Sequence, residues 1–524
     1  MTDLTSQTWD VLVIGTGIGG GVAGRRLAEA GLKVLFVERG PMGAKGEEQS
    51  LSSPVEDPTA RRVRGFWPTP LEVTIDGRTS SFFGPIGAGV GGSSVFYGAT
   101  LERPERHDLE ATEAMPHPTG GWPVSYDAYA PFMDEAEAMF HVHGEADPLG
   151  SKHNLPSPPS ISPGETALME GLRAAGLHPY HAHTALKRVP GCRTCLGFKC
   201  PKLCKMDARS AGVLPALATG KAQILDNCKV TRLTRKGARI TGVTALLEGQ
   251  AVDLKARHVV LAAGALASPG LLMASTSAQD PNGIGNTHDL VGRNLMFHLT
   301  EMFALWPKTT APDSGPSKSV AYRDHYAKDH TRLGMVQSMG IEASYGEITH
   351  YLNLMFDRSI LRGIKALRQF TRVPAFLAHR LFGKAQLFAG ILEDLPYREN
   401  RVLPTDDLDR LAFEYHFAPE LLARRKTFRK AIKRGLRGHR RAFLTYQPEL
   451  NFGHPCGTLV FGKDPATSVL DKNCRVHGLR NLTVADASFM PTSFGVNPSL
   501  MIAANALRVA DTIVKTLGAS RAKQ

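Results

Sequence analysis

The sequence predicts an α/β fold whose first part is a parallel sheet with a glycine-rich turn. Between Asp10 and Glu38 the chain contains, in order, an apolar run (11–14), a glycine-rich turn, a helical stretch closed by Gly31 and a second apolar run (33–37). Short, continuously apolar runs are typical of parallel strands that are buried on both faces. Glycine is also frequent, at 52 of 524 residues, which indicates tight turns and close backbone contacts.

The glycine-rich turn has the spacing of a dinucleotide site. Gly15 permits the tight turn, Gly17 lets the backbone approach a pyrophosphate, and Gly20 lets the helix pack closely on the strand. The N-terminus of the helix supplies free N–H groups to the phosphates. Glu38 follows the second strand, where it can accept hydrogen bonds from a ribose diol, and this argues against NADP. The motif alone does not separate FAD from NAD.

The composition is that of a large globular protein. Of the residues, 42% are hydrophobic and 21% charged, which excludes a disordered, coiled-coil or collagen-like chain. No run of about 18 apolar residues occurs, so we expect no transmembrane helix. The first ten residues do not resemble a signal peptide, and seven cysteines, an odd number, argue against a secreted disulfide scaffold. We therefore expect a cytoplasmic protein.

The net charge of +13 is concentrated in two stretches of the chain. Ten Lys and Arg and no acid lie between Arg424 and Arg441, and basic and large apolar residues are mixed between Ile360 and Lys384. Two interpretations stay open. The stretches are either helices with solvated basic faces or an amphipathic basic surface that contacts anionic lipid or an acidic partner, making the protein membrane-peripheral. Nucleic-acid binding is not expected, because no zinc-finger, helix-turn-helix or RNP pattern accompanies the charge.

Further motifs reveal a family resemblance. They are the second glycine-rich turn at 87–94, the run 259–265 continuing to Ser268, and a C-terminal series at 454–458, 486–488 and 495–499. With these motifs the chain resembles the glucose–methanol–choline (GMC) family of FAD-dependent oxidoreductases over nearly its whole length. Its ending is most similar to cholesterol and pyranose oxidases and to bacterial alcohol and sugar dehydrogenases.

The resemblance implies the domain organisation. A Rossmann-like FAD-binding domain, discontinuous in sequence, is expected at 1–105, 190–300 and 450–524. Residues 300–450 are expected to form the substrate-binding domain, a sheet backed by helices. Residues 106–189 are expected to cover the flavin and to shape the substrate entrance.

The resemblance also implies which residues contact FAD. The second glycine-rich turn offers backbone N–H groups and hydroxyls to the pyrophosphate and the flavin edge. Val230 is expected near the adenine and Asp486 near the ribityl chain. Asn497 and Pro498 precede an apolar helix (499–514), whose N-terminus helps to hold the reduced flavin. Added to the first turn and Glu38, the cofactor-binding residues are Gly89, Gly92, Ser93, Ser94, Val230, Gly264, Asp486, Asn497 and Pro498.

His454 and Asn497 are the catalytic residues that the resemblance implies. Alcohol oxidation removes the O–H proton and transfers the C–H hydride to flavin N5. A neutral imidazole suits the first task, and the amide of Asn497 can hold the alcohol oxygen. His298 is expected to be structural or to support a site residue from behind, and His477 is expected to be structural. No histidine lies at 93–97, where some relatives attach FAD, so we expect non-covalent FAD.

The function implied is FAD-dependent oxidation of a C–OH group of a sugar, a sterol or another small-molecule alcohol. The electrons would pass to oxygen or to an electron-acceptor protein. Two alternatives stay open: a non-redox flavin-dependent lyase of the same fold, and an NAD-binding protein.

A cluster of four cysteines forms the last candidate site. Cys192, Cys195, Cys200 and Cys204 lie within thirteen residues, in a loop marked by glycine and proline. Three interpretations compete. Four thiolates can hold an iron–sulfur cluster that passes electrons on from the flavin, they can form a closed zinc site, or they carry no metal.

Overall fold

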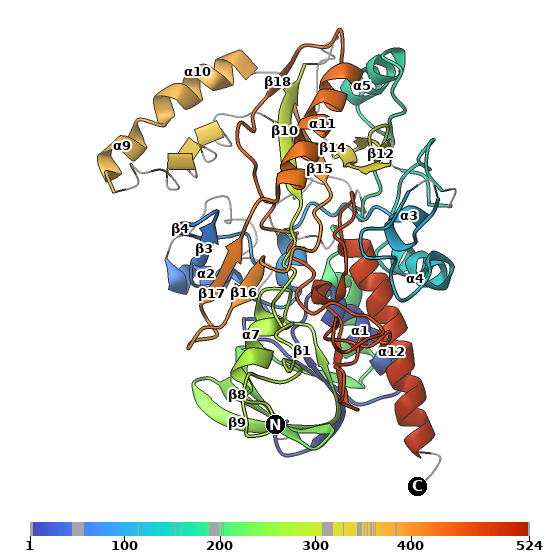
Figure 1. The fold of residues 1–524 in the computed structure, drawn as a ribbon, viewed down its shortest axis with the longest axis vertical. Coiled ribbons are helices and arrows are strands. Elements are labelled where there is room, and N and C mark those ends of the chain that lie inside the picture. The colour runs from blue at the N-terminus through green and yellow to red at the C-terminus, as the bar shows by residue number, and fades with distance from the viewer. Residues whose placement is uncertain are drawn as a thin grey trace.

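The computed structural model describes residues 4–43, 57–187, 199–306, 318–342, 348–382 and 385–521, apart from positions 114, 152, 153, 159, 201, 203, 329, 350, 351, 354, 357, 358, 360 and 362. Figure 1 shows two main parts, with elements from both ends of the chain in the lower part and a second sheet in the upper part. The predicted α/β class is confirmed.

A seven-stranded sheet forms the lower part. The strand order is β6-β2-β1-β9-β8-β7, and β19 also pairs with β9. β6, β2, β1, β9 and β19 pair in parallel, whereas β7, β8 and the first half of β9 form an antiparallel meander. The two apolar runs predicted as strands are β1 and β2, and both are buried. The strands are β1 (Thr8–Ile14), β2 (Val34–Val37), β6 (Ala222–Leu225), β7 (Cys228–Lys236), β8 (Arg239–Leu247), β9 (Gln250–Leu261) and β19 (Leu482–Val484).

Two helices from opposite ends of the chain, α1 (Ile18–Glu29) and α12 (Ser499–Arg521), pack against each other beside this sheet (Figure 1). α1 ends where the predicted glycine turns the chain, because Gly31 has a φ of +84°. α12 begins at the predicted residue and continues seven residues beyond the predicted apolar stretch. This pairing brings the C-terminal motifs to the N-terminal glycine turn.

A six-stranded antiparallel sheet forms the upper part, in the order β18-β10-β15-β14-β11-β5. α11 (Pro419–Gly435) packs closely on it, because a Cβ at Gly390 of β15 would lie only 2.7 Å from Phe428 and 3.0 Å from Ile432. The predicted sheet backed by helices is therefore present. The strands are β5 (Tyr180–His181), β10 (Leu299–Leu305), β11 (Val320–Tyr322), β14 (Gly334–Glu342), β15 (Gln386–Leu392) and β18 (Arg441–Phe443).

A four-stranded sheet joins distant segments, in the order β16-β17-β3-β4, with β3 and β17 parallel. It therefore combines strands from the predicted segments 1–105 and 300–450, and the domain boundaries stay a prediction. Its strands are β3 (Leu71–Ile75), β4 (Arg78–Phe82), β16 (Arg401–Leu403) and β17 (Leu411–Tyr415); the remaining elements are α2 (Pro58–Arg64), α3 (Arg106–Leu109), α4 (Tyr126–Met139), α5 (Pro163–Ala174), α6 (Leu214–Ala218), α7 (Ala267–Ala274), α9 (Lys365–Gln369), α10 (Arg372–Phe382), β12 (Ala327–Lys328), β13 (Thr331–Arg332) and the short turns of helix at Gly92–Phe96, Arg209–Val213 and Ala487–Phe489.

Within the described ranges, no helix combines the length and the apolar character needed to cross a membrane.

Candidate active site

A cavity of about 1740 Å³ is lined by residues of all three large sheets. It is larger than the ~300–1,000 Å³ of an ordinary ligand pocket, so it has room for a dinucleotide together with a substrate. Most of the predicted site residues line it: Gly15, Gly17, Glu38, Gly92, Ser93, Ser94, Val230, Gly264, His454, Asp486, Asn497 and Pro498. Gly20 and Gly89 lie behind this lining.

The glycines of the first turn have different surroundings: two are packed tightly against backbone atoms, and one faces open space. A Cβ at Gly15 would lie 2.4 Å from the carbonyl oxygen of Ala262, and a Cβ at Gly20 would lie 2.0 Å from the carbonyl oxygen of Gly15. A Cβ at Gly17 would meet no described protein atom within 4 Å. Gly17 also caps α1 without a side-chain hydrogen bond. The start of α1 therefore faces open cavity, as a phosphate-binding turn requires.

Glu38 stands at the end of β2 and is held by its neighbours. Its carboxylate accepts hydrogen bonds from the backbone N–H of Thr16 at 3.0 Å, from the hydroxyl of Thr16 at 2.7 Å and from the backbone N–H of Gly40 at 3.2 Å. Burial raises the pKa of Glu38, and these hydrogen bonds oppose that shift. A carboxylate has about four acceptor positions, so one remains for a further donor such as a ribose hydroxyl.

The second glycine turn lies directly against the first. A Cβ at Gly92 would be 3.0 Å from the Cα of Gly17, and the hydroxyl of Thr16 accepts a hydrogen bond from the N–H of Gly91 at 3.1 Å. Gly89 packs behind the turn, where a Cβ would lie 3.1 Å from the Cα of Gly65.

The hydroxyls of this turn hold its own backbone. Ser93 accepts a hydrogen bond from the N–H of Gly87, and Ser94 donates to the carbonyl of Gly91 and accepts from the N–H of Ala208. The serines therefore shape the turn, and what they offer to a ligand beyond this stays a prediction.

Asp486 joins two loops at the edge of the seven-stranded sheet. One carboxylate oxygen accepts from the N–H of Gly264 and the hydroxyl of Ser268, and the other accepts from the N–H and hydroxyl of Ser488. Burial raises the pKa of Asp486, and these hydrogen bonds oppose the shift. Its described bonds fix the loops that line the cavity. Val230 lies in β7, at the Glu38 end of the lining.

His454 forms a pair with His298, which was expected to be structural or to support a site residue. Its Nδ1 lies 2.9 Å from Nδ1 of His298 and 3.3 Å from the amide nitrogen of Asn451. Among the described residues, His454 Nε2 has no hydrogen-bond partner, and the side chain lines the cavity. His298 lies on the segment before β10 and is fully buried. Its Nε2 lies 3.1 Å from the carbonyl oxygen of Ser493 and 3.0 Å from that of Phe494.

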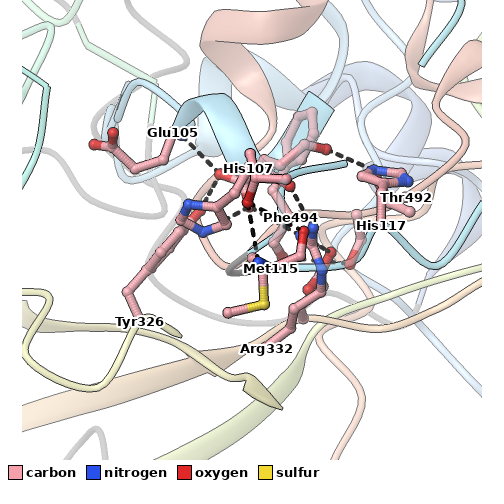
Figure 2. A network of polar contacts seen from close by, with 12 residues as sticks. Glu105, His107, Met115, His117, Tyr326, Arg332, Thr492 and Phe494 are labelled. Carbon is pink, nitrogen blue, oxygen red and sulfur yellow. Dashed lines mark hydrogen bonds and ion pairs between the residues drawn. The ribbon is translucent and has the colours of Figure 1, made fainter. Parts of the chain in front are cut away.

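A polar network holds the loop that carries those two carbonyls (Figure 2). Phe494, which has a φ of +65°, stacks on Trp122 with ring centroids 4.8 Å apart, and the indole N–H of Trp122 donates to Thr492. The segment leading to Trp122 is fixed in turn, because Arg332 donates to the carbonyl of His107. Residues of the predicted cover segment therefore support the loop behind the histidine pair.

Asn497 and Lys318 complete this end of the cavity. Asn497 is 7% exposed, and its Oδ1 is buried with no hydrogen-bond partner among the described residues. It lies just before α12, and Pro498 lines the cavity beside it. Lys318 is 6% exposed, and burial lowers its pKa to about 8. A buried amide oxygen without a protein partner marks a position where a ligand donor fits.

Two residues of the site, Thr16 and Lys318, are not predicted from the sequence, which leaves His298 open between a structural and a supporting role. Thr16 is one of the variable positions of the glycine motif, yet its hydroxyl joins both glycine turns to Glu38. Lys318 belongs to no motif. The apolar stretch around His298 gave no signal of its polar contact, because its partner lies 156 residues away in the chain.

The cysteine cluster is described only in part. Cys192 and Cys195 lie outside the described residues. Cys200 and Cys204 are buried, with sulfur atoms 3.3 Å apart. Within the described part of the chain, no group of three or more His, Cys, Asp or Glu side chains could hold a metal. The iron–sulfur, zinc and metal-free interpretations therefore all stay predictions.

The residues of the cavity fit FAD. One continuous space is lined by a turn with an open Cβ position, by the carboxylate of Glu38 and by the Asn497 oxygen, which lacks a partner among the described residues. These are the donors, acceptors and room that the two ends of a flavin dinucleotide need.

The fold and the cavity define a dinucleotide-binding oxidoreductase. The chain belongs to the GMC oxidoreductase family, which it matches over residues 10–300 and 395–506. It is 28% identical to 6'''-hydroxyparomomycin C oxidase of Streptomyces lividus, over 98% of this chain and 93% of that one. It is 27% identical to 2-methyl-1,2-propanediol dehydrogenase of Mycolicibacterium austroafricanum, over 98% and 96%.

The solved structures agree on the fold. The crystal structure of pyridoxine 4-oxidase from Mesorbium loti superposes with a TM-score of 0.62 at 21% identity, covering 96% of this chain and 99% of that one. The expected family and GMC architecture are therefore confirmed, and FAD is the cofactor of the family.

Proposed function

We propose that this enzyme oxidises a C–OH group with FAD, with His454 as the base and Asn497 as the residue that holds the alcohol oxygen. The observation that carries the proposal is the contact between His298 and His454. It orients the His454 ring so that one nitrogen is used by the protein and the other is left for a ligand in the cavity.

The proton positions follow from the partners of His298. Two carbonyl oxygens face its Nε2, and carbonyls only accept, so Nε2 carries the proton. Burial lowers the pKa of His298 to about 4, so the ring is neutral near pH 7 and Nδ1 is an acceptor. The proton between the two rings therefore belongs to His454 Nδ1. If His454 Nδ1 carried no proton, two lone pairs would face each other across 2.9 Å. It could then accept a hydrogen bond from the Asn451 amide, but that contact is longer, at 3.3 Å, so the repulsion between the lone pairs decides the proton's position.

His454 Nε2 is then the nitrogen with a free lone pair. Burial, His298 and Lys318 together lower the pKa of His454 well below its usual value of 6.5. The ring is thus neutral under ordinary conditions and can take the hydroxyl proton of an alcohol.

Asn497 supplies the second contact. Its amide N–H can donate a hydrogen bond to the alcohol oxygen while the hydroxyl proton faces His454, and its buried Oδ1, which has no partner among the described residues, is open to another donor of the ligand. When bound, FAD supplies the acceptor for the hydride that leaves the alcohol carbon. Relatives named as an oxidase and as a dehydrogenase support either oxygen or a redox protein as the final electron acceptor.

An anaerobic absorption spectrum tests the proposal. A flavin spectrum should bleach when one class among sugars, sterols and other alcohols is added, and admitting oxygen or an artificial acceptor then distinguishes oxidase from dehydrogenase. Absorption that persists between the flavin bands, together with bound iron, would support the iron–sulfur interpretation. Turnover of a substrate without bleaching would instead support the lyase alternative.

The variant His454→Ala should keep FAD and lose about 10²–10⁴-fold in the rate of flavin reduction, the usual contribution of a positioned base. His288→Ala, at an exposed position, is the matched control and should behave as wild type. Unchanged reduction by His454→Ala would remove this residue as the base.

A further inference from the structure

An arm of two short helices stands away from the sheets. α9 (Lys365–Gln369) and α10 (Arg372–Phe382) lie at the margin of the molecule, separated from α11 and the six-stranded sheet (Figure 1). Of the thirteen large hydrophobic residues that are exposed in the described chain, nine lie between Met355 and Leu381. Among the described residues, the exposed large hydrophobic side chains are therefore concentrated on this arm and on the segment that leads into it.

The arm has its apolar face outward. Phe370, Val373, Leu377 and Leu381 are spaced by three and four residues, so they share one side of the helical segment, and they are 66%, 59%, 62% and 62% exposed. A helix of a water-soluble protein normally turns such a face to the core. A contiguous exposed apolar face of this kind marks a binding surface.

The opposite face of the arm is polar and meets the cavity. Arg368 and Arg372 line the cavity, and Ala375, one turn further along the same side, is fully buried. The amphipathic pattern is thus inverted, with cationic side chains inward at the cavity and hydrophobic side chains outward. Arg372 lines the cavity and is also exposed to solvent, so the arm lies at the rim of the cavity.

The charge of the arm indicates which kind of partner binds its apolar face. From position 359 to 392 the sequence contains six Lys and Arg and no acid. The guanidinium of Arg380 lies 4.9 Å from the ring centre of Phe376, so cation and apolar surface are adjacent. At the end of α10, Phe382 stacks on Trp306, and the guanidinium of Arg440 lies 4.2 Å from the Trp306 ring. The basic surface therefore continues onto the segment after α11.

We propose that this arm, residues 363–382, docks on an anionic lipid membrane and places the rim of the cavity at the lipid surface. Large apolar residues flanked by Arg and Lys, without acids, are the pattern of helices that lie in the membrane interface. A second copy of the chain is a poorer partner, because pairing two such arms would bring like charges together. Anionic headgroups attract the exposed cations beside the apolar face, Arg380 and Arg440, and each cation near the surface adds to the attraction.

Co-sedimentation of the holoenzyme with vesicles tests the docking. The protein should bind vesicles that contain phosphatidylglycerol in phosphatidylcholine, bind pure phosphatidylcholine more weakly, and lose binding as salt rises. The variant F370S/V373S/L377S/L381S should lose roughly tenfold or more in partition coefficient, because its apolar contact area is removed. The four residues are exposed, so the variant should keep its FAD absorbance and melting temperature.

A matched control changes exposed apolar residues elsewhere. Val63 and Leu149 are each 53% exposed, and V63S/L149S should bind vesicles as wild type does. In a second measurement, Phe370→Trp should show tryptophan quenching by brominated lipids.

Two results would overturn the docking. One is equal binding by wild type and the four-residue variant, or no binding by either. The other is a dimer in solution that the four-residue variant converts to a monomer, since the face would then be a self-association surface. Vesicle binding needs no turnover, so its failure and a failure of the proposed alcohol oxidation are separate results.

Discussion

The Nδ1 atoms of His298 and His454 lie 2.9 Å apart, although the residues are separated by 156 positions. Two backbone carbonyls accept from Nε2 of His298, which leaves Nδ1 of the neutral ring as an acceptor. The proton between the two rings is then expected on Nδ1 of His454, the ring that faces the cavity. His298 is therefore proposed as a positioning residue for His454.

Replacing His298 removes the Nδ1 acceptor that it offers to His454, which tests this relationship. His298→Phe keeps the volume but leaves the N–H of His454 without a partner, so flavin reduction should slow by roughly ten- to hundredfold, part of the 10²–10⁴ that a base contributes. His298→Gln offers an oxygen acceptor and should recover part of the rate. A structural role would predict equal losses in both variants and no change in the pH profile.

Lys318 should set the acid limit of activity. Its charge helps to lower the pKa of His454, and the base works only when neutral. Lys318→Met should raise that pKa, so the fall in the rate of flavin reduction on the acid side should move to higher pH. Lys463→Met, at the exposed surface, is the control and should leave the profile in place. A shift toward lower pH would contradict the argument.

Asn497→Leu should separate catalysis from stability. The amide oxygen of Asn497 has no described protein partner, so an apolar side chain of similar size should leave the melting temperature of the apoprotein unchanged or higher. The same variant should lower the rate of flavin reduction and weaken alcohol binding. A large loss of apoprotein stability would show that the amide serves the fold instead.

Substitutions at Gly17 and Gly20 of the first turn should have different effects. Gly17→Val should fold but lose FAD, because its side chain would enter open cavity and not protein. Gly20→Ala should fail to accumulate as folded protein, because its Cβ would lie 2.0 Å from the carbonyl oxygen of Gly15. Circular dichroism and the flavin-to-protein absorbance ratio distinguish the two results. Gly164→Ala, where the nearest atom is 3.8 Å away, is the neutral control. A yellow Gly17→Val protein would refute the phosphate placement.

His258 should contribute to acid sensitivity. Burial lowers its pKa to about 3, and its ring nitrogen contacts the hydroxyl of Thr483 at 2.8 Å. Below pH 6.5 the unfolded chain takes up a proton that the folded chain does not, so stability falls as pH drops, by up to about 1.4 kcal/mol per pH unit. His258→Gln should therefore show a smaller loss of melting temperature between pH 7.5 and pH 5. An unchanged difference would mean that His258 is protonated in the folded protein.

The first unit of the fold could be predicted because its signals are local. The spacing of Gly15, Gly17, Gly20 and Glu38 requires a strand, a tight turn, a helix and a second strand, and these elements are present. The later motifs also predicted that His454, Asp486 and Asn497 would meet one space, and all three line the cavity. Backbone constraints of this kind act over a few residues, so short sequence motifs are enough to predict them.

Other features depend on contacts between distant segments. The hydroxyl of Thr16 accepts a hydrogen bond from the second turn. His298 contacts His454 and the carbonyl of a loop almost 200 residues away in the chain. Lys318 reaches the cavity without any motif.

The sequence by itself determined the family, the dinucleotide turn and the composition of the basic arm, because these depend on residue type and short spacing. The tertiary structure alone decided that Nδ1 of His454 meets His298 while its other side faces the cavity, and that the apolar face of α10 points outward. Proton positions and exposure depend on which atoms are brought within a few ångströms by folding, and this information exists only once distant segments meet.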